Sequence, residues 1–191
     1  MNFSPLSDLM PALRRHISGP FEELLLDELR RSAITFCRNS MFVAVRRTIA
    51  SAAAGDLLTI CDIDNLKAAE LQHVIDADGN PLQAGEAYSL MSSNEINVLF
   101  PWTSVTLVYA AEPIGSTSLL PSSLVSDYGD EIAYGAAASL YSQKGRPWED
   151  ADRSVYYSRL FTEGWRKAFR IRKENQVAIV EFNPVRKHTF Y

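Results

Sequence analysis

The sequence predicts an α+β protein, in which a bundle of about four helices carries an antiparallel β region inserted between its second and third helices. Apolar residues recur at helical spacing in the first and last thirds of the chain. Between them, short β-type runs alternate with turn-forming residues. The length of 191 residues favours one domain. We expect two helices in residues 1–41, the β region in 42–112, a helical hairpin in 124–174 and an extended arm in 175–191. Residues 176–191 alternate in part, so they could form a strand or an arm that orders only on a partner.

Two helices are expected before the β region. The first lies within Ser7–His16. It is short, because Pro11 is unfavourable in a helix interior and Gly19-Pro20 ends the helix. The second spans Phe21–Arg38, where one apolar stripe follows helical spacing and two glutamates lie in the first turn.

The middle of the chain is expected to form short antiparallel strands. Asp78-Gly79-Asn80 is typical of a hairpin turn, and Ser92-Ser93-Asn94-Glu95 marks a second one. The segment Gly115–Ser123 is expected to be a polar loop that leads into the third helix. The predicted strands are residues 42–49, 57–61, 71–75, 81–82, 88–91, 96–100 and 104–110.

Two long helices follow this loop. The third is expected to begin at Ser126, whose hydroxyl suits an N-cap, and to end near Gln143. One of its faces carries small residues, so another helix can approach it closely. The fourth begins after a second N-cap residue, Asp150, and runs to about Glu174. Its apolar stripe consists of Tyr157, Leu160, Phe161, Gly164, Ala168 and Ile171.

The segment Lys144-Gly145-Arg146-Pro147-Trp148 joins these two helices and contains residue types that often bind phosphate or nucleic acid. A helix-hairpin corner explains it more simply. Gly145 suits the left-handed position that follows a helix, and Pro147 stops the helix from continuing. We expect Trp148 to hold the corner against the bundle, while Lys144 and Arg146 face solvent or a neighbouring subunit.

The charges are distributed unevenly along the chain. The net charge is −4, but the residues after Trp165 include seven Lys or Arg and only two acids. This end therefore carries +5 and the rest of the chain carries −9. Such a division suggests an interacting tail, or contact between the acidic body of one copy and the basic end of another.

The sequence does not favour membrane insertion or secretion. No uninterrupted apolar run approaches the roughly 18 residues that a membrane span needs. The first five residues lack the basic and apolar regions of a signal peptide, so we expect a soluble protein made in a cytoplasm. The two cysteines, Cys37 and Cys61, are expected to be buried free thiols.

No pattern in the sequence favours catalysis or a bound cofactor. The three histidines lie in different segments without ligand spacing, which predicts no metal site. Two short segments resemble the start of a calcium-binding loop: Asp62-Ile63-Asp64 and Asp76-Ala77-Asp78. Both lack the glycine and the final glutamate of that loop. Turn and cap roles explain these aspartates better. We therefore expect a protein that is not an enzyme.

Four cations gather on one broad side near the end of the fourth helix, at successive separations of one, three and three residues, with Trp165 and Phe169 among them. This set could be a solvated helix face that complements the helix dipole. It could also contact a protein partner, because Arg and aromatic residues are enriched in interfaces, or a nucleic acid. The sequence pI of about 5.4 is low for a dedicated nucleic-acid-binding protein. The four cations are Arg166, Lys167, Arg170 and Lys173.

One combination of features extends over both helical parts. The segment before the β region reads DELRRSAITFCRNS (Asp27–Ser40). After the β region, the chain over Ser126–Arg172 contains an Ala/Gly-rich helix, a loop ending in Pro-Trp, and a Tyr/Phe-rich helix followed by basic residues. Over roughly a third of the chain, this arrangement resembles the head-to-tail adaptor (connector) proteins of tailed bacteriophages. The matching positions are Tyr128, Ile132, Ala133, Gly135, Ala136, Leu140, Gly145, Pro147, Trp148, Tyr157, Phe161 and Gly164.

The resemblance implies a single-domain structural virion protein at the head–tail junction, made in the host cytoplasm. Adaptors of this family form a twelve-fold ring under the portal, meet tail proteins and let double-stranded DNA pass through the channel with transient contact. Their C-terminal segment commonly reaches the portal. The expected interface residues are therefore the four cations and, in the arm, Val177, Ile179, Phe182, Phe190 and Tyr191.

Two alternatives remain open at this point. The protein could be a nucleic-acid-binding module that uses its basic fourth helix. It could also be another virion protein, a tail terminator or a tail-tube protein. A ring requires one surface to complement a different surface on the next copy, and an acidic body with a basic end could supply both.

Overall fold

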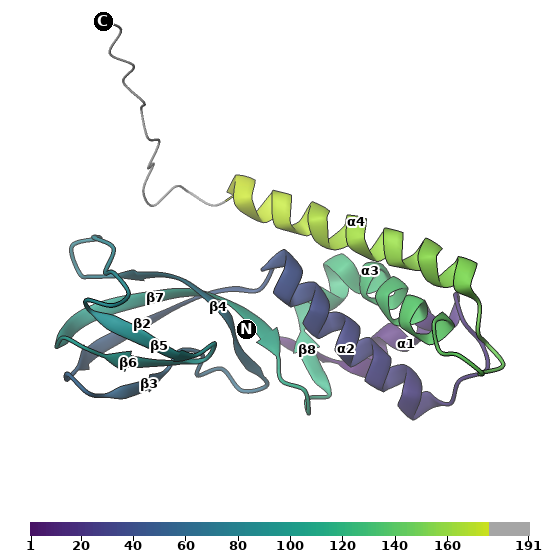
Figure 1. The fold of residues 1–191 in the computed structure, drawn as a ribbon, viewed down its shortest axis with the longest axis horizontal. Helices are drawn as coiled ribbons and strands as arrows, with labels where there is room; N and C mark the ends of the chain where they lie inside the picture. Colours follow the sequence, from purple (N-terminus) through teal and green to yellow (C-terminus); the bar gives the residue numbers. More distant parts are fainter. Residues whose placement is uncertain (176–191) are drawn as a thin grey trace, which may run out of the picture.

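The computed structural model describes residues 1–175, which form a helical part and a β part side by side along the long axis (Figure 1). The α+β class is confirmed. The expected interface residues Val177, Ile179, Phe182, Phe190 and Tyr191 lie outside the described residues. So does the predicted arm, except for Asn175, which is the last residue of a helix.

Four α-helices lie within residues 1–175, close to their predicted positions. The first is short, as expected, and follows a 3-10 turn, η1 (Leu6–Leu9). The second buries a stripe against the core and ends at Met41, which has left-handed backbone angles (φ 51°). The helices are α1 (Met10–Arg14), α2 (Glu22–Ser40), α3 (Ser122–Tyr141) and α4 (Ala151–Asn175).

The predicted start of the third helix at Ser126 is wrong, because α3 begins one turn earlier, after Pro121. Leu124 in the added turn is fully buried, which anchors that turn to the core. The Ser126 hydroxyl does not cap the helix. It donates to the backbone oxygen of Ser123 (3.2 Å) instead. At Tyr128 the backbone leaves helical geometry, and α3 bends there.

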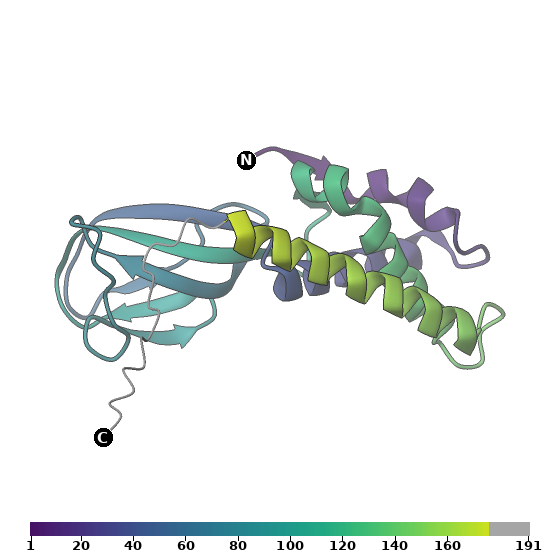
Figure 2. The same ribbon diagram turned by 90° about the horizontal axis from the view of Figure 1, so that it is seen from above.

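The β part consists of two antiparallel three-stranded sheets that pack together (Figures 1 and 2). Side chains from both sheets, among them Ile96 and Leu107, are fully buried between them. One sheet has the order β2-β7-β4 and the other β3-β6-β5. The strands are β2 (Ala44–Ala52), β3 (Leu57–Thr59), β4 (Leu66–Ile75), β5 (Tyr88–Ser92), β6 (Glu95–Val98) and β7 (Trp102–Pro113).

A third sheet corrects the prediction that strands occur only in one inserted region. β1 (Phe3–Pro5) pairs antiparallel with β8 (Leu119–Pro121) beside the helices, where the sequence predicted a loop at Gly115–Ser123. The Ser4 hydroxyl also donates to that of Ser122 (2.9 Å). Each strand is only three residues long, and its partner is more than a hundred residues away. No local pattern could therefore reveal the pair.

Both predicted hairpin turns are present. Asp76 organises the first, because its carboxylate accepts the backbone N–H groups of Asp78 (2.9 Å) and Asn80 (2.8 Å). The hydrogen bond from Asn80 is the main reason that the pKa of Asp76 lies below its usual value. The strand predicted at residues 81–82 is reduced to a single bridge between Ile75 and Pro81. The second turn joins β5 to β6.

A buried carboxylate joins the two parts of the molecule. Glu112, on the central strand β7, is 2% exposed. It accepts two hydrogen bonds from Arg38 in the last turn of α2, at 2.8 and 2.7 Å, and lies 3.3 Å from the ammonium of Lys67 on β4. The bond to Glu112 raises the pKa of Arg38. Next to this pair, burial raises the pKa of the Cys37 thiol. Cys37 and Cys61 are both buried free thiols, as predicted.

The small residues of α3 let another helix approach closely, as the sequence predicted, and in the structure both α2 and α4 do so. A Cβ on Gly135 would lie 2.2 Å from the hydroxyl oxygen of Ser32 on α2 and 2.8 Å from the ring of Phe161 on α4. A Cβ on Gly164 of α4 would lie 2.4 Å from Glu131. The Ser32 hydroxyl also donates to the backbone oxygen of Ile132 (2.7 Å).

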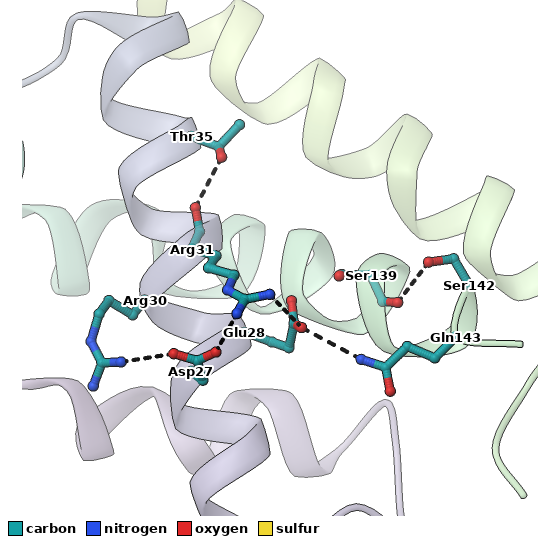
Figure 3. Close-up of polar contacts among 8 residues, drawn as sticks. All are labelled: Asp27, Glu28, Arg30, Arg31, Thr35, Ser139, Ser142 and Gln143. Atoms are coloured by element: carbon teal, nitrogen blue, oxygen red, sulfur yellow. Dashed lines mark hydrogen bonds and ion pairs between the residues drawn. The ribbon is translucent and has the colours of Figure 1, made fainter. Parts of the chain in front are cut away.

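Polar contacts add to the packing of α2 against the end of α3 (Figure 3). Glu28 is a buried acid of α2, and it faces Arg31 (3.5 Å) and the amide of Gln143 (3.4 Å). Asp27, one residue earlier, lies between Arg30 and Arg31 and pairs with both. Since Gln143 follows α3, the Glu28 contact fixes where the α3–α4 corner starts relative to α2.

Replacing Arg38 with Met should lower the free energy of unfolding by about 1–3 kcal/mol, because the buried Glu112 carboxylate loses two hydrogen bonds. Arg14→Met is the matched control, since Arg14 and Glu22 form an exposed pair at 3.8 Å. Such pairs contribute less than about 1 kcal/mol. Urea unfolding measures both variants, and equal losses would contradict the role of Glu112.

Replacing Gly135 with Ala should destabilise the protein by about 1–3 kcal/mol, although Ala favours helices, because the new methyl group overlaps Ser32 and Phe161. Gly115→Ala is the control, because the space around Gly115 is open. Thermal unfolding followed by circular dichroism compares the two. If the Gly135→Ala variant has the same melting temperature as the wild type, the helices can move apart there without loss of stability.

Candidate interaction surface on helix α4

Helix α4 lies across α3 and α2, and its C-terminal end reaches the β part (Figures 1 and 2). The predicted apolar stripe faces the other helices: Gly164 and Ala168 are buried, and Tyr157 and Phe161 are half-buried. Ile171 departs from the prediction, because its side chain is 39% exposed. It lines a groove of about 410 Å³ between the end of α4 and strands β2 and β7.

The corner before α4 has the predicted geometry. Gly145 has a left-handed backbone (φ 74°), and its N–H donates to the carboxylate of Glu149 (2.6 Å). Asp150 caps α4 by accepting the backbone N–H of Arg153 (3.0 Å). Trp148 is half-buried and packs against the core, with the Arg146 guanidinium 5.9 Å from its ring centroid. The Lys144–Trp148 segment therefore fixes the angle between α3 and α4.

The four predicted cations lie together on the outer side of α4, and all four side chains are exposed. The structure also places Arg159 on this side, seven residues before Arg166. We refer to Arg159, Arg166, Lys167, Arg170 and Lys173 as the basic surface. None of them forms an ion pair with another residue in the part of the chain that the structure describes.

Aromatic rings support the basic surface from below. The Arg166 guanidinium lies 5.4 Å from the ring centroid of Trp165, and the Lys173 ammonium lies 5.7 Å from that of Phe169. Both rings are half-buried. Next to them is an open groove of about 590 Å³, lined by Glu163, Arg166, Lys167, Phe169 and Arg170. The surface thus combines positive charge with apolar area, as protein interfaces often do.

Sequence reasoning missed one cation and two apolar residues on this side of α4. Arg159 extends the basic surface toward the corner, and its spacing to Arg166 was the available signal. Val155 and Tyr156, one turn earlier, are 54% and 57% exposed. Exposed apolar side chains next to a charged surface are a common feature of contact sites.

Arg172 belongs to the same run of cations but turns inward. Its guanidinium donates to the Gln72 side chain on β4 (2.7 Å) and to the backbone oxygen of Met41. Burial lowers the pKa of Arg172, while the charge of Glu70 opposes this change. This side chain fastens the end of α4 to the β part, so the basic surface has a fixed direction relative to the whole molecule.

A cluster of rings packs around His16 where α1, α3 and α4 meet. The His16 ring lies 5.1 Å from that of Tyr134 and 5.3 Å from that of Tyr157. The Tyr141 hydroxyl donates to the backbone oxygen of His16 (2.6 Å). Burial lowers the pKa of His16, the charge of Arg15 lowers it further, and Asp130 raises it.

Within residues 1–175, no three side chains among His, Cys, Asp and Glu are grouped so that they could hold a metal ion. None of the helices in this range is both long and apolar enough to cross a bilayer.

Comparison with protein-family models and with curated protein sequences found no match to the chain.

Replacing His16 with Gln should reduce the pH dependence of stability below neutral pH. Because the folded protein lowers the pKa of His16 from 6.5, the unfolded chain binds this proton more readily. The wild type therefore loses stability as the pH falls below about 6.5, and the loss levels off below the folded-state pKa.

Denaturant unfolding at pH 7 and pH 5 measures this effect. His73→Gln, on the exposed side of β4, controls for the loss of a histidine elsewhere. The difference between the two variants isolates His16. If both variants lose as much stability as the wild type between these pH values, the ring cluster does not couple folding to protonation.

Proposed function

We propose that this protein is a structural protein of a tailed-bacteriophage virion, a head-to-tail adaptor that assembles as a ring under the portal. Its ring connects the capsid to the tail and lets double-stranded DNA pass through the channel. The proposal starts from the sequence resemblance over Asp27–Ser40 and Ser126–Arg172. The observation that carries it is the basic surface, which α4 presents on a firmly packed support.

The support for the basic surface is closely packed and held at both ends. Glycine positions let α2, α3 and α4 meet closely, as Gly135 and Gly164 show. Arg172 fixes the far end of α4 to the β part, and Asp150 caps its start. When such a surface binds, its backbone is already in place and the cost is mainly that of ordering its side chains, which favours assembly into a regular ring.

The residues that carry the resemblance build this support and are not the surface itself. Ile132, Ala133, Ala136 and Leu140 of α3 are fully buried. Many unrelated helix pairs use small residues in this way, so the packing by itself does not identify a function. The exposed cations that the packing holds in place favour a protein that binds other macromolecules.

The resemblance also implies partners for this ring. A twelve-fold ring would meet the portal on one side and tail proteins on the other, at the head–tail junction of the virion. The C-terminal arm is proposed to reach the portal through Val177, Ile179, Phe182, Phe190 and Tyr191. DNA would touch the channel only in passing, because each phosphate contact adds salt-dependent affinity that would hinder movement.

A second candidate function is a nucleic-acid-binding module. One observation favours it, since Arg166 and Lys173 lie over aromatic rings in a row of exposed cations. Such a surface suits a phosphate backbone. The net charge of −4 weakens this candidate, because the rest of the chain repels DNA. A tail terminator or a tail-tube protein would use the same surface between copies without a portal.

Ending the chain after Asn175 should give a folded protein that no longer joins the portal. The full-length chain and the truncated chain are each mixed with purified portal and viewed by electron microscopy. We expect rings on the portal only with the full-length chain. A thermal melt checks the fold, because loss of cooperative melting would mean that residues 176–191 are needed for folding.

Two further results would favour the other candidates. Micromolar, salt-dependent binding of the free protein to DNA, with no ring on the portal, would support the nucleic-acid-binding module. Rings or tubes that form without any affinity for the portal would support a tail terminator or a tail-tube protein. The mass of the assembly distinguishes a ring from a tube.

A further inference from the structure

An acidic groove lies on the helical part beside α4, where Glu131 contacts Gly164. It has a volume of about 410 Å³ and is formed by η1, α1 and the first half of α3. In Figure 2, α1 and the start of α3 lie to one side of α4. Four acids line the groove: Asp8, Asp127, Asp130 and Glu131.

Three of these acids have no ion-pair partner among residues 1–174. Asp8, Asp127 and Glu131 form no salt bridge there, whereas Asp130 pairs with Arg15 at 2.5 Å. Their charge affects a neighbouring ring: the pKa of Tyr134 is raised by burial and then by Asp130 and Glu131. The groove therefore has a negative potential that the fold itself does not neutralise.

The groove and the basic surface both contain apolar side chains between their charged groups. Leu9, Ala12, Val125 and Tyr134 line the groove between the acids. The basic surface likewise contains apolar area between its cations, from Trp165 and Phe169. Glu163 lies among the cations and Asp130 is paired with Arg15, but the two surfaces keep opposite net charges around apolar side chains, which is the pattern of complementary interfaces.

We propose that the basic surface of one copy docks into the acidic groove of the next copy. This contact rests on the proposed function, and it names the two surfaces that join neighbouring subunits. Within one chain the two surfaces do not pair: Glu131 of the groove lies against Gly164 of α4, yet no acid of the groove forms an ion pair with a cation of the basic surface among residues 1–174. A second copy offers the missing partner to each.

The contact is heterologous, which has a consequence for the assembly. Each docked pair leaves one groove and one basic surface free, so further copies add in the same way until a ring closes. The acidic groove also decides between occupants of the basic surface. DNA could cover the cations but would leave the groove unmatched, whereas a second copy matches both.

Two charge-reversed variants test this contact. Arg166→Glu with Arg170→Glu makes the basic surface acidic, and Asp8→Lys with Asp127→Lys makes the groove basic. All four side chains are exposed and lack ion-pair partners within residues 1–174. Thermal melting of each variant confirms that it folds. The matched control is Glu86→Lys with Glu95→Lys, which reverses two exposed acids on the β part.

Sedimentation velocity over a range of concentrations measures self-association at low salt. Each variant alone brings like charges together, so we expect association at least about tenfold weaker than in the wild type. The control variant should associate as the wild type does. Added salt should weaken the wild-type association, because exposed charges are screened over about 10 Å at 0.1 M.

An equal mixture of the two variants is the decisive sample. The acidic α4 of one variant faces the basic groove of the other, and the basic α4 of the second faces the acidic groove of the first. Both contacts are then complementary, so the mixture should recover assembly with alternating copies. A single chain with all four substitutions should recover it as well.

Three outcomes would overturn the proposed contact: a wild type that stays monomeric at every concentration, variants that associate like the wild type, or a mixture that fails to recover. The portal assay reports separately on the proposed function. Wild-type rings that depend on both surfaces but ignore the portal would contradict the adaptor role and leave this contact standing. Portal-bound rings that still form when all four charges are reversed would support the adaptor role and contradict this contact.

Discussion

The arrangement of this molecule depends on the buried carboxylate of Glu112. It lies on the central strand of one sheet, and both of its oxygens accept hydrogen bonds from Arg38 at the end of α2. A buried acid without such partners would strongly destabilise the fold. The β part and the helical part are therefore held at one angle. Arg172 can then reach Gln72, and α4 lies where both parts support it.

This fixed arrangement turns a charge asymmetry of the sequence into two separate surfaces. The cations near the end of the chain become one side of α4, where helical spacing aligns Arg159 with Arg166. The acids come together differently, because Asp8 and Asp127 are distant in sequence and meet only when η1 packs on α3. Among residues 1–174 the groove is neutralised only in part, because Arg15 pairs with Asp130, and the cations of the basic surface form no ion pair.

The features that could be predicted from the sequence are those that local patterns encode. Helical periodicity gave α2, α4 and the four cations, and Gly145 with Pro147 gave the corner between α3 and α4. The pairing of β1 with β8 and the acidic groove depend on contacts between distant segments, which no local pattern contains. The start of α3 was missed because burial of Leu124 outweighed the preference of Ser126 for an N-cap.

The size of each interaction assigns different roles to charge and apolar area in the proposed contact. An exposed ion pair contributes about 0.2–1 kcal/mol, so the three unpaired acids of the groove supply at most about 3 kcal/mol. Bringing two proteins together costs at least about 4 kcal/mol. Charge alone therefore cannot hold the copies together, and Val125, Tyr134, Trp165 and Phe169 must supply the remainder. The charges instead select which surfaces meet and speed their encounter, and closure of a ring makes a weak contact persistent.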